Sequence, residues 1–209
     1  TPERSSAASD VYKRQTTGVL TIEPDADENS FASSFDNQYL NPVSVTGLTL
    51  GKSSNASAIT LSRAISLSGP VSIYGGSIDV NANITANSGN ILLDADTGST
   101  LNQSSTGILL DDVITIETVT SGNLTLIGRS GDTGSGFDGI DASSANTTTL
   151  RSAGNLTLQG YSYAASGSGR GVDLNNDVIA ASGTVSMSGQ HNTGATSVSY
   201  THLRAHETQ

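Results

Sequence analysis

The sequence contains no cysteine and no tryptophan, and it has few basic residues. The absence of cysteine excludes a disulfide-stapled domain, zinc–thiolate sites and thiol chemistry. There are 9 Lys and Arg residues against 19 Asp and Glu residues, which gives a net charge of −10. A chain this acidic is a poor partner for nucleic acid and for an anionic membrane surface. No apolar run is long enough to span a bilayer, so we expect no direct membrane insertion.

What the sequence does contain is an internal repeat. The segment GNLTL at residues 122–126 returns letter for letter at residues 154–158. It returns with conservative changes at residues 89–93 and more loosely at residues 183–187. Each copy indicates a turn followed by a short strand with alternating apolar residues, and a second strand follows at residues 107–110, 139–141 and 171–174. A strand–loop–strand unit that recurs every thirty-odd residues is typical of a repeat architecture.

The remaining sequence also indicates strands, and no window shows a sustained helical stripe free of glycine. The predicted strands before the repeats are residues 16–24, 45–50, 58–61, 65–67, 70–74 and 78–84. Residues 25–42 are acidic and without a period, so we expect a loop there. We therefore predict an all-β fold with little or no helix.

One repeat cannot bury its apolar side alone, so successive repeats are expected to stack in parallel. Leu124 would then lie over Leu156, and Leu126 over Leu158. Asn90, Asn123 and Asn155 would form an amide ladder at a turn, each side chain bonding the next. A right-handed parallel β-helix (a solenoid) meets these demands. A β-sandwich is the alternative, since short strands with frequent turns also suit it.

Both ends of the chain resemble translated adapter DNA. Residues 5–15 and 198–208 back-translate into DNA that resembles the two adapters of transposase-based sequencing libraries. The reverse complement of the codons proposed for residues 10–15 encodes the residues found at 198–202. We therefore expect residues 1–15 and 198–209 to be non-native tails. Between them we predict an entry strand and acidic loop at 16–46, β-helix turns at 47–88, and the repeat array at 89–197.

Several motifs resemble binding or catalytic sites, but each is better interpreted as a structural segment or a surface residue. Residues 134–139 match G-x-G-x-x-G, but they lead to a predicted strand and a Thr-rich turn where a dinucleotide site needs a helix. Residues 47–53 resemble a phosphate loop but are one residue short and strand-like. His191 is expected on a surface turn. We predict no enzyme activity and assign no catalytic, cofactor-binding or metal-binding residue.

Asp141 and Asp173 share one position of the repeat and are expected to lie one turn apart. Like charges at that separation repel unless a cation or a proton intervenes. Calcium at this pair is a hypothesis, because hard oxygen ligands suit that ion but a full set of ligands is not visible. Leu109 occupies the equivalent position of the preceding repeat, so the column of carboxylates is expected to be interrupted.

The repeats, with residues 47–52 (GLTLGK), 58–61 (AITL) and 69–84 (GPVSIYGGSIDVNANI), resemble filamentous-haemagglutinin-type exoproteins and autotransporter passengers. The resemblance covers about residues 45–189. It implies a long right-handed β-helix that is exported across the outer membrane and acts as a bacterial surface adhesin. It implies an extracellular location and a surface or glycan ligand bound through regions outside this chain.

An alternative from another class is a β-helical polysaccharide lyase or hydrolase. Such an enzyme needs carboxylates and a cation on one face. Between residues 16 and 197 the basic residues are scattered, and only Arg129 or Arg170, near Asp138 or Asp173, can begin such a cluster. We also expect the chain to self-associate, because the open ends of a coil expose unpaired strand edges.

Overall fold

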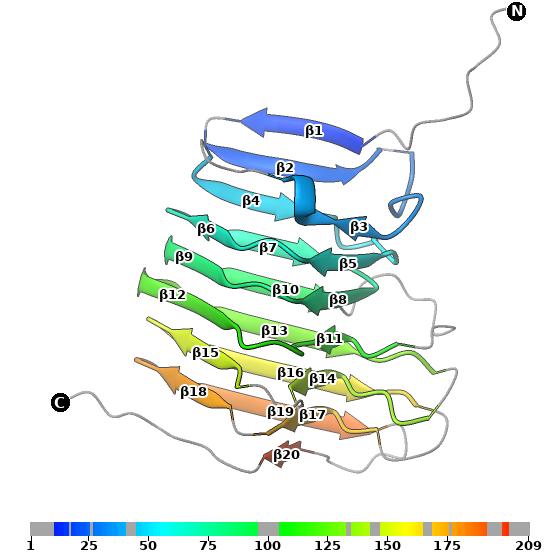
Figure 1. The fold of residues 1–209 in the computed structure, drawn as a ribbon, viewed down its shortest axis with the longest axis vertical. Helices are drawn as coiled ribbons and strands as arrows, with labels where there is room; N and C mark the ends of the chain where they lie inside the picture. Colours follow the sequence, from blue (N-terminus) through cyan, green and yellow to red (C-terminus); the bar gives the residue numbers. More distant parts are fainter. Residues whose placement is uncertain are drawn as a thin grey trace, which may run out of the picture.

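The computed structural model describes residues 11–16, 18–25, 27–40, 45–95, 105–132, 135–142, 147–164, 169–175, 177–191 and 198–200. These residues form three sheets in which the chain places one strand after another. From residue 47 onward the chain adds a strand to the first sheet, then to the second and then to the third, before it returns to the first (Figure 1). The fold is therefore all-β, with stacked parallel strands.

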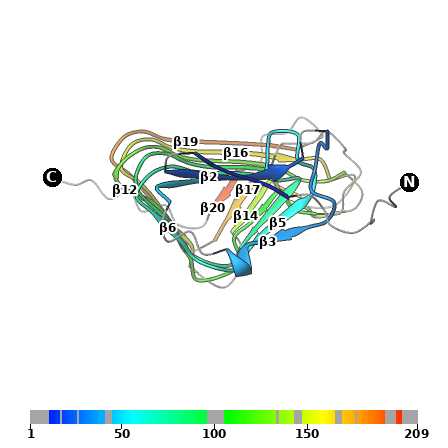
Figure 2. The same ribbon diagram turned by 90° about the horizontal axis from the view of Figure 1, so that it is seen from above.

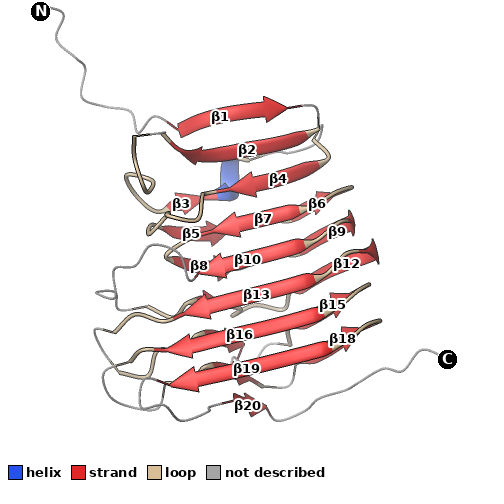
Figure 3. Cartoon of the chain, turned by 180° about the vertical axis from the view of Figure 1, so that it is seen from behind, coloured by secondary structure: helices blue, strands red, loops and turns tan. Residues whose placement is uncertain are grey.

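The first sheet, which we call sheet A, has eight strands. In sheet order they are β1 (Val11–Thr16), β2 (Val19–Pro24), β4 (Gly47–Leu50), β7 (Val71–Tyr74), β10 (Ile91–Ala95), β13 (Leu124–Arg129), β16 (Leu156–Ser162) and β19 (Val185–His191). Figure 3 shows this sheet face on. All neighbouring pairs are parallel except β1 and β2, which are antiparallel.

Sheets B and C complete the structure. Sheet B contains β3 (Phe35–Asp36), β5 (Ala58–Leu61), β8 (Ser77–Val80), β11 (Ile108–Leu109), β14 (Ile140–Ala142), β17 (Val172–Leu174) and β20 (Val198–Tyr200). Sheet C contains β6 (Ile65–Leu67), β9 (Ile84–Ser88), β12 (Thr115–Ser121), β15 (Thr149–Ser152) and β18 (Val178–Ala181). Viewed from above, the three sheets enclose one interior (Figure 2). This parallel pairing is compatible with a parallel β-helix and contradicts the β-sandwich alternative.

The interior is a set of apolar columns that follow the register of the strands. Leu124 pairs with Leu156 and Leu126 with Leu158, as the repeats predicted. All four side chains are fully buried, and the intervening Thr125 and Thr157 are partly exposed on the other face. Burying a side chain of this size contributes about 1.5 to 3 kcal/mol, so the columns account for much of the cohesion between turns.

The predicted asparagine ladder is present, but its hydrogen bonds differ from the prediction. The side-chain oxygen of Asn90 accepts a bond of 2.9 Å from the backbone N–H of Asn123. That of Asn123 accepts one of 2.8 Å from the N–H of Asn155, and that of Asn155 one of 2.9 Å from the N–H of Thr184. The side chains therefore bond the backbone of the next turn, because a turn leaves an amide there without a strand partner.

The glycine that begins each of the four repeat copies has one of two functions. Gly89 and Gly122 have φ of +119° and +111°, a backbone conformation that favours glycine. Gly154 and Gly183 do not share that conformation, but a Cβ atom on either would press against the side-chain oxygen of Asn123 or Asn155. In the later turns the glycine is needed for space.

Three strand predictions were wrong. The later repeats have a third strand, in sheet C, and β15 lies where we expected a Thr-rich turn. Leu150 is the only apolar residue of β15, so the apolar alternation of this strand is faint. The predicted strand 78–84 is two strands, because residues 81–83 form the corner between sheets B and C, where the Asn83 side chain accepts a bond from Thr115 N–H. The predicted strand 16–24 is interrupted at Gly18.

The predicted acidic loop contains more structure than expected. It includes β3 and a 3-10 turn, η1 (Asn37–Tyr39), and the rings of Phe31 and Phe35 stack with their centroids 5.2 Å apart. The Lys52 ammonium group donates to the backbone oxygen of Asp25 at 3.1 Å and to that of Glu28, so this lysine fastens the loop to sheet A. Within the described ranges no helix has the length and apolar character needed to cross a bilayer.

Two strands lie in the terminal segments that we expect to be non-native. β1 extends sheet A beyond β2, and β20 extends sheet B beyond β17. The non-native origin of residues 1–15 and 198–209 stays a prediction, as do the boundaries at 46, 88 and 197.

Candidate functional site

A cluster of acidic residues lies around sheet B, where two consecutive turns meet. Asp138 and Arg170 occupy equivalent positions before β14 and β17, as their backbone bonds to the preceding turns indicate. A side-chain oxygen of Asp138 accepts a bond from the backbone N–H of Arg170. As in the asparagine ladder, a side-chain oxygen accepts a hydrogen bond from a backbone N–H of the next turn, and this bond holds Asp138 in place.

Asp141 and Asp173 pair directly in the register of β14 and β17, as the repeat predicted. One carboxylate oxygen from each of Asp138, Asp141 and Asp173 lies within 4.8 Å of the others. The Arg170 guanidinium forms an ion pair with the Asp173 carboxylate, whose side chain is only 8% exposed. Arg170 therefore lies beside Asp138 and Asp173, which is one of the arrangements that the sequence left open. Arg129 instead has its guanidinium carbon 4.5 Å from the centroid of the Tyr163 ring.

Burial raises the pKa of Asp138 to about 6, and the neighbouring charges of Asp141 and Asp173 act in the same direction. The bond from Arg170 N–H opposes this change without cancelling it. The repulsion expected between stacked carboxylates is thus relieved in two ways. A cation, Arg170, accompanies Asp173, and Asp138 takes up a proton more readily than an exposed carboxyl group.

Asp177 is a fourth carboxyl group close enough to interact with Asp141 and Asp173. It precedes β18, and its two oxygens accept bonds of 3.0 Å from the backbone N–H groups of Thr148 and Asn175. Burial raises its pKa to about 6 despite these bonds. No motif of the sequence singles out Asp177. Its position directly before the apolar pair Val178-Ile179, as a buried corner residue, is the signal that could have identified it.

The column of carboxylates on sheet B is interrupted as predicted. Leu109 pairs with Asp141 on one side and with Asp79 on the other. Asp79 receives a bond of 3.1 Å from the side-chain amide of Asn81. The acidic cluster is therefore confined to the turns that contain β14 and β17.

The chemistry of the cluster allows two interpretations. Three convergent carboxylates are hard oxygen ligands of the kind that calcium prefers. Alternatively, a carboxyl group with a pKa of about 6, near two other carboxyl groups and an arginine, is suited to proton transfer. Arg170 already supplies a positive charge within the cluster, which weakens the case for calcium.

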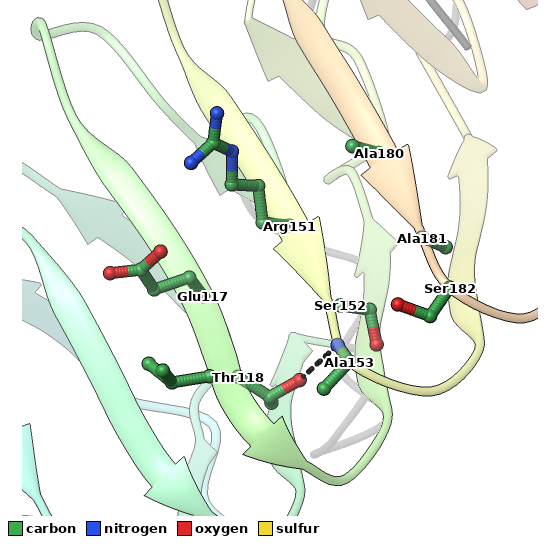
Figure 4. Close-up of a pocket in the computed structure, with 9 residues that line it drawn as sticks. Glu117, Thr118, Arg151, Ser152, Ala153, Ala180, Ala181 and Ser182 are labelled. Atoms are coloured by element: carbon green, nitrogen blue, oxygen red, sulfur yellow. Dashed lines mark hydrogen bonds between the residues drawn. The ribbon is translucent and has the colours of Figure 1, made fainter. Parts of the chain in front are cut away.

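A shallow pocket of about 440 Å³ lies on the outer face of sheet C. It is lined by Glu117, Thr118, Val119, Arg151, Ser152, Ala153, Ala180, Ala181 and Ser182, from the ends of β12, β15 and β18 (Figure 4). Glu117 and Arg151 pair in register across it, and the Thr118 hydroxyl accepts a bond of 2.8 Å from the Ala153 N–H. No motif indicated this pocket, because its lining comes from three turns of the chain.

The residues of the rejected motifs lie in structural positions. The G-x-G-x-x-G segment leads into β14, and the segment that resembles a phosphate loop begins as β4. His191 is the last residue of β19, and not a turn residue as expected.

The fold and the cluster define an all-β protein of three stacked parallel sheets, with buried carboxyl groups near one face. Comparisons with family models, with curated proteins and with solved structures found no match for this chain.

Proposed function

We propose that the chain is a segment of a right-handed parallel β-helix that serves as the structural stalk of a large secreted bacterial surface protein. The observation that supports this proposal is the register of sheet A. From β4 to β19 each strand pairs in parallel with the next and keeps its apolar residues in the same two columns. Stacking of this kind extends in one direction and adds length without needing new core contacts of a different type.

In this proposal the segment has a mechanical role, which is to hold a binding region away from the cell. The net charge of −10 and the polar outer faces suit a rod that remains soluble outside the cell. An adhesin of the haemagglutinin type would bind its surface or glycan ligand through regions outside these residues. The resemblance of the repeats is the reason for placing the protein at the bacterial surface.

The test is a long sequencing read across the parent gene, free of adapter sequence. The stalk proposal predicts an open reading frame that continues through many more such turns, begins with an export signal and neighbours a gene for an outer-membrane transporter. A frame that closes soon after residue 197 around one short β-helix would overturn the proposal.

A second candidate function is cleavage of a polysaccharide at the acidic cluster. The observation that favours it is the pKa of about 6 for Asp138, next to Asp141, Asp173 and Arg170. In such a reaction a protonated Asp138 would act as general acid and a second carboxylate would act as base or nucleophile. Purified chain at high loading would then release sugar from plant or bacterial polysaccharides, and Asp138→Asn would abolish the release. Absence of sugar release from the unaltered chain would exclude this function.

A further inference from the structure

The corner where sheet C leads back into sheet A changes size from one turn to the next. Three residues, 119–121, join Thr118 to the glycine that begins its repeat copy, and the register shifts between Thr118 and Ser121. In the next two turns only Ala153 and only Ser182 occupy the equivalent place. The corner that follows β12 is therefore longer than the two corners after it, and it forms a step on the surface.

The pocket of about 440 Å³ on sheet C lies at this step (Figure 4). Val119, on the longer corner, is 49% exposed and lines the pocket. The two shorter turns contribute Ala153, Ala180 and Ala181, whose small side chains leave the space open. This volume lies within the range of small-molecule sites, so the pocket has room for a ligand.

Two opposite charges lie beside this space without meeting each other. Glu117 and Arg151 pair in register on β12 and β15, and both line the pocket. Figure 4 shows their charged ends apart, and among the described residues neither charged group takes part in an ion pair or a hydrogen bond. The hydroxyl groups of Thr118 and Ser152, in contrast, bond backbone groups of the corner. The pocket therefore offers a carboxylate and a guanidinium group to a ligand.

This pattern of charge discriminates between classes of ligand. A simple anion is attracted by Arg151 and repelled by Glu117, and a simple cation meets the opposite balance. An uncharged ligand displaces water from both charged groups without supplying a counter-charge to either. A zwitterion carries both signs a few atoms apart, so a single small molecule can satisfy both side chains.

We propose that this pocket binds a small zwitterion of the α-amino acid type, with its ammonium group at Glu117 and its carboxylate at Arg151. A guanidinium group and a carboxylate form paired hydrogen bonds of matching geometry, which suits Arg151 to this part. An apolar side chain on the ligand contacts Val119 and the alanines of the pocket. This inference adds a binding site to the segment, and it depends neither on the stalk role nor on cleavage at the acidic cluster.

The test is a titration of the whole isotope-labelled chain with L-leucine, followed through the backbone amide signals in NMR spectra. We expect saturable shifts of signals from the pocket, such as those of Ala153 and Ser182, and no comparable shifts from sheet B. Acetate and methylammonium carry one charge each and should bind about tenfold more weakly or less. Glycine should also bind more weakly than leucine, because it has no apolar side chain to bury.

Single substitutions test the part given to each charge. Glu117→Gln and Arg151→Gln should each raise the dissociation constant for leucine about fivefold or more. Glu23→Gln and Arg63→Gln remove the same charges from positions outside the pocket and are the matched controls, with no change expected. If the pocket variants bind leucine as tightly as these controls do, the two charges do not hold the ligand and the proposal is wrong.

A further variant tests the location of the site. Ala180 pairs in register with Arg151, so Ala180→Leu fills part of the pocket without altering its charge. Leucine binding should be lost, while the circular dichroism spectrum and the thermal unfolding of the chain are retained. Unchanged binding by this variant, equal binding of acetate, or no saturable shift with leucine in the unaltered chain would overturn the proposal.

Discussion

The side-chain oxygen of Asn123 accepts a hydrogen bond of 2.8 Å from the backbone N–H of Asn155, one full turn further along the chain. Replacement by alanine leaves that amide without its protein partner and should lower the free energy of unfolding by about 0.5 to 1.5 kcal/mol. Asn123→Asp keeps an acceptor oxygen and is the control, with a smaller loss expected. Urea denaturation measures both, and equal losses would show that the bond contributes nothing.

Gly160 lies at a position where sheets A and B approach closely. A Cβ atom there would overlap the backbone carbonyl of Gly171, and neither backbone can move without disturbing its strand. We expect Gly160→Ala to cost about 3 kcal/mol or more in thermal or urea unfolding. Gly136→Ala is the comparison, because its φ of +78° leaves strain of about 1 to 2 kcal/mol but no atom lies near the added Cβ.

The apolar columns should lose strength toward their open end. Leu126 is fully buried in the middle of its column, and Leu126→Ala should cost about 2 to 5 kcal/mol. Met187 occupies the end of the same column and is only partly buried. Met187→Ala should therefore cost less than half as much, as measured by urea unfolding at low protein concentration. Equal costs would mean that something covers the end of the column.

The buried carboxyl groups make stability depend on pH. The pKa values of Asp138 and Asp177 are raised from 3.8 to about 6 in the folded chain. The folded state therefore holds their protons more tightly, so their contribution is fully present below pH 3.8 and is lost as the pH rises through about 6. Each group should make the chain about 1 to 3 kcal/mol less stable at pH 7.5 than at pH 4.

Asparagine variants test the assignment of this pH dependence. Asp138→Asn keeps an acceptor for the Arg170 N–H and should remove its share of the change in unfolding free energy between pH 4 and pH 7.5. Asp27→Asn removes one carboxylate from an exposed position and is the control for net charge. The assignment is wrong if the two variants have the same pH profile.

Calcium binding should depend on Arg170. In the unaltered chain its guanidinium pairs with Asp173, so we expect no heat and no thermal shift on titration with calcium. Arg170→Met removes the cation and leaves three carboxylate oxygens within 4.8 Å, which should allow weak calcium binding. A calcium-dependent thermal shift in the unaltered chain would restore the calcium hypothesis for Asp141 and Asp173.

The sequence predicted the parallel columns because identical residues recur in them. Leu124 and Leu126 return as Leu156 and Leu158, and stacking requires identical turns to coincide. The sheet-C strand at residues 65–67 was predicted, but the sheet-C strands of the later repeats were missed. In β15 only one apolar residue, Leu150, is buried, so no apolar alternation is visible in the sequence. A structural period can be recognised in a sequence only where several apolar residues follow it.

The acidic cluster was partly predictable for the same reason. Asp141 and Asp173 share a repeat position, and Arg170 stood out because basic residues are rare. Asp177 was missed although it directly precedes the apolar pair Val178-Ile179. The pocket between Glu117 and Arg151 was not predictable, because its lining comes from the ends of three sheet-C strands that belong to different turns. The hydrogen-bond partner of each ladder asparagine likewise depends on the backbone of the next turn.

Successive turns differ in length although their register does not. Val71 pairs with Ile91, which lies 20 residues later, and Ile91 pairs with Leu124, which lies 33 residues later. Most of the difference falls between sheets A and B, where Gly75 and Gly76 join β7 to β8 but residues 96–107 join β10 to β11. This junction can therefore gain or lose sequence during evolution while the scaffold remains constant. It is also where a foreign peptide could be grafted at the least cost to folding.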